Sequence, residues 1–161
     1  MANLSKIEQY LKDRKIKHKI SDLGGEVYKV EDVIKAGVNP DQILKTLIIR
    51  STVKEGLELK DKYFALVLRG KDRIDFKKVR RLFEGKSDLA KPEEVKKVAG
   101  VPVGAVCPIL LDIPIYIDKN AMRLEHVNMG SGDLTCELEM NFSDLLGAIG
   151  KYEIADLTFG V

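Results

Sequence analysis

The sequence predicts a mixed α/β or α+β fold built around a mixed β-sheet. Apolar, β-branched runs typical of buried strands lie at 43–51 and 63–70. Segments with helical spacing surround these runs, but they do not alternate with strands as regularly as βαβ units would. No repeat, low-complexity segment or linker interrupts the 161 residues, so we expect a single domain over 1–161.

The elements of the first half follow from apolar spacing and from residues that end or begin helices. Leu4, Ile7 and Leu11 recur at helical spacing and predict a helix over 4–15. Glycine commonly follows the last turn of a helix, and proline commonly opens one. These signals predict a strand over 17–23, a helix over 30–37 closed by Gly37, a helical turn from Pro40, strands over 43–51 and 63–70, and a polar hairpin-like loop over 54–62.

The second half contains three further predicted helices. Asp75 precedes an amphipathic segment and is the expected cap of a helix over 75–83. Its apolar residues Phe76, Val79 and Leu82 are expected to face the core. The remaining predicted elements are a strand near 87–90, a helix from Pro92 that ends at Gly100, strands over 113–118, 123–129 and 134–140, a helix capped by Asn141, and a strand over 152–159.

The composition is that of a folded protein, with 45% hydrophobic and 32% charged residues. No apolar run approaches the ~18 residues needed to cross a bilayer, so we expect a cytoplasmic location and no membrane partner. The net charge of +2 hides an asymmetry, because residues 112–161 hold three basic and nine acidic residues. The first 111 residues therefore carry a charge of +8, which favours a polyanionic partner.

Motifs for metal or nucleotide chemistry are absent from the sequence. The available soft metal ligands are His18, Cys107, His126 and Cys136. No two of them have the close spacing of a zinc site, so neither a metal nor a cofactor is expected. The GSGD stretch at 130–133 looks like part of a phosphate loop, but a turn between two strands is the ordinary role of these residues.

The sequence allows two interpretations for Lys45 and two for Cys107. Lys45 lies inside the apolar run 43–49, where an unpaired buried amine is unfavourable. Its side chain should therefore reach a cavity or an anionic partner, or alternatively extend to solvent from the strand end. Cys107 could act as a nucleophile only if a base lowered the pKa of its thiol; otherwise it is a small buried apolar residue.

A basic segment follows the second long strand. Residues 69–81 contain seven basic and only two acidic side chains. On the predicted helix, Lys77, Arg80 and Arg81 share one face. This face is either solvated or a patch that binds phosphates, and the charge asymmetry of the chain is consistent with the second interpretation.

Three short motifs occur in a fixed order along the chain. They are K-T-L at 45–47, P-E-E-V at 92–95 and V-G-x-x-x-P at 103–108, and a GSG turn at 130–132 follows them. Together they resemble the family of YbaK and the prolyl-tRNA synthetase-associated domain, over roughly residues 4–157. The resemblance implies a mixed, curved, partly barrel-like β-sheet with packed helices, and an aminoacyl-tRNA deacylase activity.

The resemblance also implies a reaction and a set of site residues. The reaction is hydrolysis of the ester between a wrong small amino acid and the 3′-terminal adenosine of a tRNA, typically tRNA for proline. A water performs it, helped by the ribose hydroxyl of the substrate and by backbone donors. Lys45 and Gly104 would be catalytic. Substrate-binding residues would be Tyr28, Ala105, Val106, Cys107, Pro108, Gly130, Ser131, Gly132, Asp133 and Thr135, and tRNA-binding residues Arg73, Lys77, Arg80 and Arg81.

Differences from the family pattern leave the edited amino acid undefined. Cys107 stands where the family often has serine, and Tyr28 stands where a threonine is expected. Thr135 occupies the position of an aspartate in cysteine-editing members, with Asp133 as a nearby substitute. Alanine-specific members carry a histidine near the GSG turn, whereas residues 128–132 read NMGSG.

Three functions are compatible with the sequence. The first is a free-standing deacylase that meets mischarged tRNA, and an aminoacyl-tRNA synthetase as an expected partner, in trans. The second is a non-catalytic tRNA- or synthetase-binding module that keeps the pocket, and the third is a hydrolase of a small ester. Turnover of mischarged tRNA distinguishes the first, and salt-dependent tRNA binding without turnover distinguishes the second.

Overall fold

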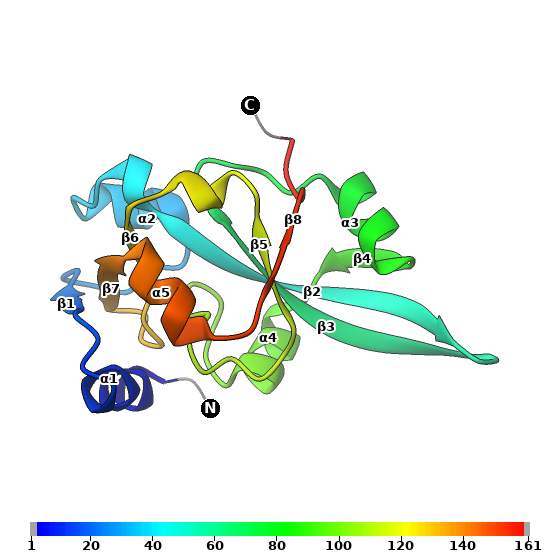
Figure 1. Cartoon of the computed structure of the whole chain (residues 1–161), viewed down its shortest axis with the longest axis horizontal. Coiled ribbons are helices and arrows are strands. Elements are labelled where there is room, and N and C mark those ends of the chain that lie inside the picture. The colour runs from blue at the N-terminus through cyan, green and yellow to red at the C-terminus, as the bar shows by residue number, and fades with distance from the viewer. Residues whose placement is uncertain (1–2, 160–161) are drawn as a thin grey trace.

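The computed structural model describes residues 3–159, which form two β-sheets with helices packed around them (Figure 1). The helices are α1 (Leu4–Asp13), α2 (Val30–Lys35), η1 (Pro40–Gln42), α3 (Phe76–Phe83), α4 (Pro92–Ala99), η2 (Ala121–Arg123) and α5 (Phe142–Ile149). The strands are β1 (Lys19–Asp22), β2 (Leu44–Glu55), β3 (Glu58–Arg69), β4 (Lys86–Leu89), β5 (Ile115–Asp118), β6 (His126–Gly130), β7 (Cys136–Asn141) and β8 (Glu153–Ala155).

The larger sheet is mixed, as predicted. Its order is β4-β2-β3-β5-β8, with β2 antiparallel to β3 and β4, and β5 parallel to β3 and β8. The smaller sheet, β1-β7-β6, is antiparallel, and a bridge between Ile43 and Asn128 joins it to the beginning of β2. The mixed α+β fold is therefore confirmed. The barrel-like part of the prediction is not supported, because across the described strands the sheet does not close into a barrel.

Capping residues set the boundaries of the helices that flank the larger sheet. The Asp75 carboxylate accepts a hydrogen bond from the Lys77 amide (3.0 Å), and α3 begins directly after Asp75. Pro92 is the first residue of α4, where its fixed φ suits a helix start. Gly100 ends α4 in the left-handed conformation, at φ 78°. Both predicted helix boundaries are confirmed.

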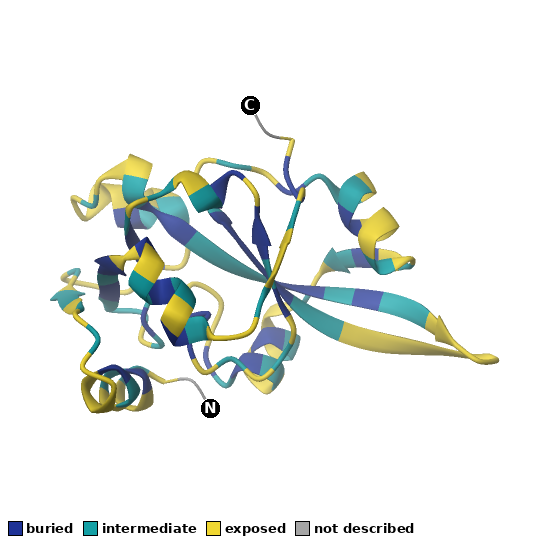
Figure 2. Ribbon diagram, in the orientation of Figure 1, coloured by how far each residue is buried: buried dark blue, intermediate teal, exposed yellow. Residues whose placement is uncertain are grey.

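The alternation of side chains along β2 divides them between two cores. Leu44 and Ile48 pack into the main core, which contains residues of both sheets and of α1, α4 and α5. Leu47 and Ile49 point to the opposite face and pack into a second core with Val79 of α3. Because both faces of β2 are covered here, the strand reads as a continuous apolar run (Figure 2).

The polar segment 54–62 is strand for most of its length, whereas the sequence predicted a loop. β2 and β3 pair continuously up to a turn at Gly56 and Leu57. This end of the hairpin projects far from the body of the molecule, and much of it is exposed (Figures 1 and 2). Polar residues are therefore compatible with strand structure here, because the two strands pair with each other and have little core to cover.

Two predictions for individual side chains differ from the structure. Leu82 was expected to face the core but is 41% exposed. Phe83 packs inward in its place and stacks on Phe64, with 3.9 Å between the ring centroids. Asn141 directly precedes α5 as expected, but its side chain makes no capping hydrogen bond.

Candidate functional site

A cavity of about 610 Å³ opens beside the first residues of β2. This volume lies within the range of small-molecule binding sites. Parts of the chain that are distant in sequence contribute to the wall. They include the segment before and within α2, the beginning of β2 with Ile43, the 70–73 loop, the end of β4, α4 through Val95, the 103–106 loop, Gly130 of β6 and Glu137 of β7.

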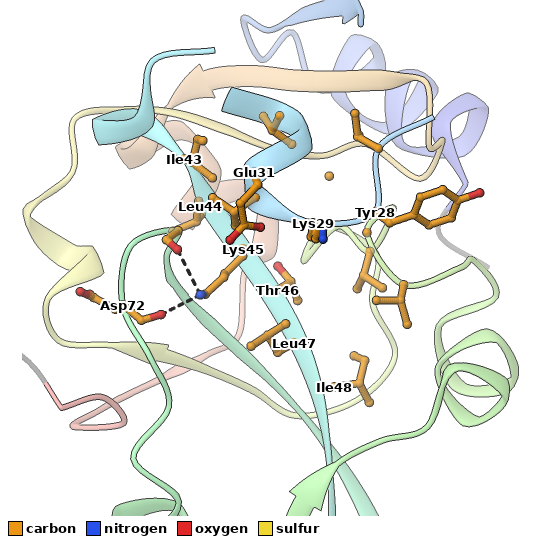
Figure 3. A pocket seen from close by; sticks show the side chains of 18 of the residues that line it. Tyr28, Lys29, Glu31, Ile43, Leu44, Lys45, Thr46, Leu47, Ile48 and Asp72 are labelled. Atoms are coloured by element: carbon orange, nitrogen blue, oxygen red, sulfur yellow. Dashed lines mark hydrogen bonds between the residues drawn. The ribbon is translucent and has the colours of Figure 1, made fainter. Parts of the chain in front are cut away.

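Lys45 lies in the wall of this cavity and is held by backbone acceptors. Its Nζ donates hydrogen bonds to the carbonyl oxygens of Gly70 (3.1 Å) and Asp72 (2.6 Å), as Figure 3 shows. An ammonium group has three N–H donors, so one remains for a ligand. The side chain is half-buried and reaches across to the 70–73 loop. Of the two alternatives that the sequence left open, the structure therefore favours a lysine that reaches a cavity over one that extends into solvent.

The environment of Lys45 balances burial against nearby charges. Burial lowers the pKa of the Lys45 ammonium, whereas the carboxylates of Asp72 and Glu31 raise it and the Arg73 guanidinium lowers it. Glu31 projects from α2 on the same side of the cavity as Lys45 (Figure 3). A partly desolvated amine held in this way can bind an oxygen atom of a ligand more strongly than a surface lysine can.

Gly104 and Gly130 allow the 103–106 loop to lie very close to its neighbours. Gly104 has φ 94°, and a Cβ atom there would lie 2.8 Å from Tyr28 Cα and 2.9 Å from the Val27 carbonyl oxygen. A Cβ atom on Gly130 would likewise overlap the carbonyl oxygen of Val106. The loop is therefore enclosed between the 27–28 segment and β6, and side chains at these two positions would displace it.

The same loop presents backbone donors that have no partner within the described residues. The Ala105 amide donates to the Pro102 carbonyl (3.1 Å), but the amides of Gly104 and Val106 donate to no described acceptor. Both residues line the cavity, and Val106 is only 5% exposed. Gly104 is exposed, so water can reach its amide, whereas the buried amide of Val106 needs an acceptor. Both N–H groups are free to donate to a ligand oxygen.

Cys107 lies behind this wall. Its side chain is 1% exposed, it does not line the cavity, and burial raises the pKa of its thiol to about 12. A thiol with this pKa is protonated at neutral pH and is a poor nucleophile. The structure therefore favours the interpretation of Cys107 as a small buried residue.

Substitution of Cys107 by serine is expected to leave kcat/KM for the deacylation that the sequence predicts within about threefold of the wild-type value, because a protonated thiol is a poor nucleophile. The serine hydroxyl can accept the hydrogen bond that the Cys107 sulfur receives from the Ile109 backbone. Steady-state kinetics of the variant, with a thermal melt to verify folding, tests this expectation. Complete loss of activity in a folded Cys107→Ser protein would contradict it.

The GSGD stretch joins β6 to the segment before β7, so the predicted strand-to-strand turn is confirmed. The Ser131 hydroxyl donates to the Cys136 carbonyl (2.7 Å), and the Asp133 carboxylate accepts the Thr135 amide (2.8 Å). These side chains hold the turn. Of the predicted substrate-binding residues, Tyr28, Val106 and Gly130 line the cavity, whereas Ala105, Cys107, Pro108, Ser131, Gly132, Asp133 and Thr135 do not.

The predicted tRNA-binding residues are divided between the cavity wall and α3. Arg73 lines the cavity, and Lys77, Arg80 and Arg81 follow on α3 with exposed side chains. Arg80 has a distant ion pair with Asp88 (3.5 Å), which is exposed and therefore weak. Phosphates could readily replace this ion pair.

Glu137 is a cavity residue that the sequence did not predict. It lies on β7, is only 4% exposed, and its carboxylate has no hydrogen-bond or ion-pair partner within the described residues. Burial raises the pKa of this carboxyl to about 8. It alternates along the strand with the core residue Leu138, a pattern that in sequence indicates a solvent-facing acid.

The raised pKa of Glu137 predicts a pH-dependent stability. The unfolded chain releases the proton near the ordinary pKa of 4.5, whereas the folded chain keeps it until about pH 8. The free energy of unfolding should therefore fall between these two values as pH rises, by on the order of 3–5 kcal/mol relative to Glu137→Gln. Urea unfolding of both proteins from pH 4.5 to 8.5 measures this difference; parallel pH profiles would contradict the prediction.

The described lining of the cavity does not contain a serine or cysteine nucleophile with a histidine base. The described residues of the lining include no serine, histidine or cysteine side chain. His18 and His126 bond instead to the Ile16 carbonyl and to Glu139. Within residues 3–159, no cluster of histidine, cysteine, aspartate and glutamate has the makings of a metal site, and no helix could span a membrane. The described lining can therefore offer a ligand hydrogen bonds, charges and apolar contacts.

The sequence pattern described as the aminoacyl-tRNA editing domain matches residues 25–148, a range that includes every cavity-lining residue. The chain belongs to the aminoacyl-tRNA editing domain family. A solved structure of a candidate trans-editing enzyme for prolyl-tRNA synthetase has 25% sequence identity to this editing domain and a TM-score of 0.78. The match covers 98% of this chain and 97% of that one.

Curated relatives connect this editing domain to synthetases and to a smaller protein. The proline–tRNA ligases of Caldicellulosiruptor bescii and Chlamydia trachomatis serovar A are 26% and 33% identical, over 73% and 71% of this chain. The chain covers only 20% of the length of each ligase. The uncharacterized protein YwhH of Bacillus subtilis is 32% identical over 68% of this chain and 66% of its own length.

Proposed function

We propose that this editing domain hydrolyses the ester bond between a wrong small amino acid and the 3′-terminal adenosine of a tRNA, with tRNA for proline as the expected substrate. One observation carries the proposal: Lys45 and two loop residues whose amides have no described acceptor line the same cavity, and its described lining includes no serine or cysteine. Membership of the editing-domain family and the similarity to proline–tRNA ligases support it.

The proposed chemistry is direct attack by water. Water adds to the ester carbonyl, and the amides of Gly104 and Val106 donate hydrogen bonds to the oxyanion that forms. The tetrahedral intermediate then breaks its bond to the ribose oxygen, which takes up a proton and leaves as the free hydroxyl of the tRNA. The neighbouring ribose hydroxyl of the substrate assists the proton transfers, and Lys45 orients the terminal nucleotide or the ester. The products are a free amino acid and an uncharged tRNA.

Selection of the amino acid would depend mainly on volume. The apolar part of the cavity wall includes Leu44, Ile48 and Val95. An apolar wall distinguishes side chains by about 1–3 kcal/mol per methylene group, a limit that a synthetase site shares. A separate editing cavity that excludes the correct amino acid and hydrolyses esters of smaller ones adds its own selectivity. The overall selectivity is then the product of the selectivities of the synthetase site and the editing cavity.

The test uses tRNA for proline charged with alanine, cysteine, serine or proline, and follows the loss of the labelled aminoacyl ester. We expect at least one small non-cognate amino acid to be released well above the rate in buffer, and faster than proline. Binding of tRNA that weakens with salt, without release of any amino acid, would instead favour a non-catalytic binding module. Hydrolysis of small amino acid esters without any preference for tRNA would favour a general esterase.

The proposed partners are tRNA and, in trans, an aminoacyl-tRNA synthetase, with the cytoplasm as the proposed location. The exposed basic residues of α3 would contact tRNA phosphates.

The double substitution of Arg80 and Arg81 by alanine should weaken tRNA binding and reduce the slope of log K against log salt by about one for each phosphate that the variant no longer neutralises. Lys151→Ala, an exposed change after α5, is the matched control and should leave the slope unchanged. Equal slopes in all three proteins would contradict this assignment of α3.

A further inference from the structure

The carboxyl group of Glu137 is buried in the cavity wall without a protein partner. Its strand position pairs with Ser21 of β1 and Gly130 of β6, and neither offers a charge. Within the described residues, two side-chain polar atoms have no partner and almost no accessible surface: Thr46 Oγ1 and Asn120 Nδ2. The Glu137 oxygens also have no partner, but they are not fully enclosed. Because Glu137 lines the cavity, we take their remaining accessible surface to face it.

The other acidic residues of the cavity lining are engaged or exposed. Asp72 binds the Arg69 guanidinium with two hydrogen bonds (2.7 and 3.1 Å). Glu31 is exposed, and its carboxylate, like that of Asp72, raises the pKa of the Lys45 ammonium. Glu137 differs from these two acids because it is buried and the structure shows no cationic partner for it within the described residues.

We propose that Glu137 binds the α-ammonium group of the aminoacyl substrate, so that the cavity selects esters with a free amine over N-acylated ones. This inference rests on the function proposed above. Every aminoacyl ester carries such an amine next to the reacting carbonyl. An ammonium that entered this largely apolar cavity without a partner would incur a large desolvation penalty, which a carboxylate within hydrogen-bond distance offsets.

Binding of a substrate ammonium should change the protonation state of Glu137. Burial alone raises the pKa of Glu137 to about 8, so the empty cavity at pH 7 holds mainly the neutral acid. A cation beside the carboxyl favours its ionised form and lowers its pKa. Binding of an ammonium at pH 7 therefore releases the Glu137 proton to solvent, and an N-acylated ligand, which has no cation, releases none.

The decisive probes are two non-hydrolysable analogues of the aminoacylated tRNA end: adenosine that carries alanine through a 3′-amide, with either a free or an acetylated amine. Calorimetry at pH 7 measures their dissociation constants for the wild-type protein and for Glu137→Gln. The wild type should bind the free-amine analogue at least about tenfold more tightly, as expected for one charge-assisted hydrogen bond. Glu137→Gln should lose this preference.

Glu139→Gln is the matched control, because Glu139 lies two residues along the same strand but pairs with His126 away from the cavity lining (2.6 Å). This variant should keep the wild-type preference. Equal binding of the two analogues by the wild type, no binding of the free-amine analogue at millimolar concentration, or an unchanged preference in Glu137→Gln would each overturn the inference.

A measurement on the unaltered protein gives an independent test. Binding heats in buffers of different ionisation enthalpy report the number of protons released. The free-amine analogue should release up to about one proton at pH 7 and the acetylated analogue none. Release by neither analogue would overturn the assignment even if Glu137→Gln failed to fold.

Failure of this inference can be separated from failure of the proposed function. Hydrolysis of alanyl-tRNA for proline and of its N-acetylated form at equal rates would leave the deacylase function intact and overturn the role of Glu137. The opposite result, a free-amine preference that depends on Glu137 but no hydrolysis of any charged tRNA, would retain the amine site and overturn the deacylase.

Discussion

Substitution of Lys45 by methionine is expected to lower kcat/KM for deacylation of mischarged tRNA by at least about 100-fold, comparable to the loss of one oxyanion donor. The Lys45 ammonium is the only cation among residues 44–49 of β2. It also holds the 70–73 loop, because it donates hydrogen bonds to two carbonyl oxygens there. Methionine keeps a similar length and an apolar stem, so the packing of the strand should survive. Single-turnover hydrolysis with saturating protein measures the chemical step directly.

The control for this experiment is Lys35→Met. Lys35 is an exposed residue in the last turn of α2 and does not line the cavity. The change removes one positive charge near the site without altering the wall, so activity should stay within about twofold if the loss in Lys45→Met is local and not a general charge effect. A folded Lys45→Met protein that keeps wild-type activity would remove Lys45 from the mechanism.

The second large effect is expected for Gly104→Ala. The backbone at φ 94° is strained for any residue with a Cβ atom, and that atom would overlap the backbone of residues 27 and 28. The free energy of unfolding should fall by about 1–3 kcal/mol, and the loop amides should move away from the substrate. We therefore expect activity to be lost at temperatures where the variant is still folded. Urea unfolding and deacylation assays on the same preparation separate the two effects.

Gly147→Ala is the matched control for this change. Gly147 lies within α5, and a Cβ atom there has nothing within 4 Å. Alanine is a better helix former than glycine, so the free energy of unfolding should rise by up to about 1 kcal/mol with activity unchanged. If Gly104→Ala also keeps wild-type stability and activity, the close approach of the loop to Tyr28 is not essential for either.

Much of the secondary structure could be predicted because local signals determine it. The helix after Asp75 and the helix from Pro92 to Gly100 depend on capping residues that are visible in the sequence. The outer end of the β2–β3 hairpin could not be predicted in this way. Its strand structure comes from pairing between two polar segments, so it has neither an apolar run nor an apolar alternation to reveal it.

The candidate site was less accessible to prediction, because it depends on long-range packing. Lys45 could be singled out since a lysine within an apolar strand needs a partner, but the partners, the carbonyl oxygens of Gly70 and Asp72, lie about 25 residues away in sequence. Glu137 looks like a surface residue in the sequence, but the folded chain buries it in the cavity wall. Conversely, Asp133 and Thr135 seemed available to a substrate but are occupied with each other.

The projecting hairpin divides the molecule into parts of unequal local stability. β4 pairs with β2 only at 49–52, and β5 pairs with β3 only at 65–67, so in the described structure residues 53–61 have strand partners only within the hairpin. A two-stranded ribbon by itself is marginally stable in water. Its amides should therefore exchange with solvent through brief local openings that leave the inner half paired. The cavity lies at that inner half, where residues 43–48 are fixed by both cores, and so it is insulated from motion at the tip.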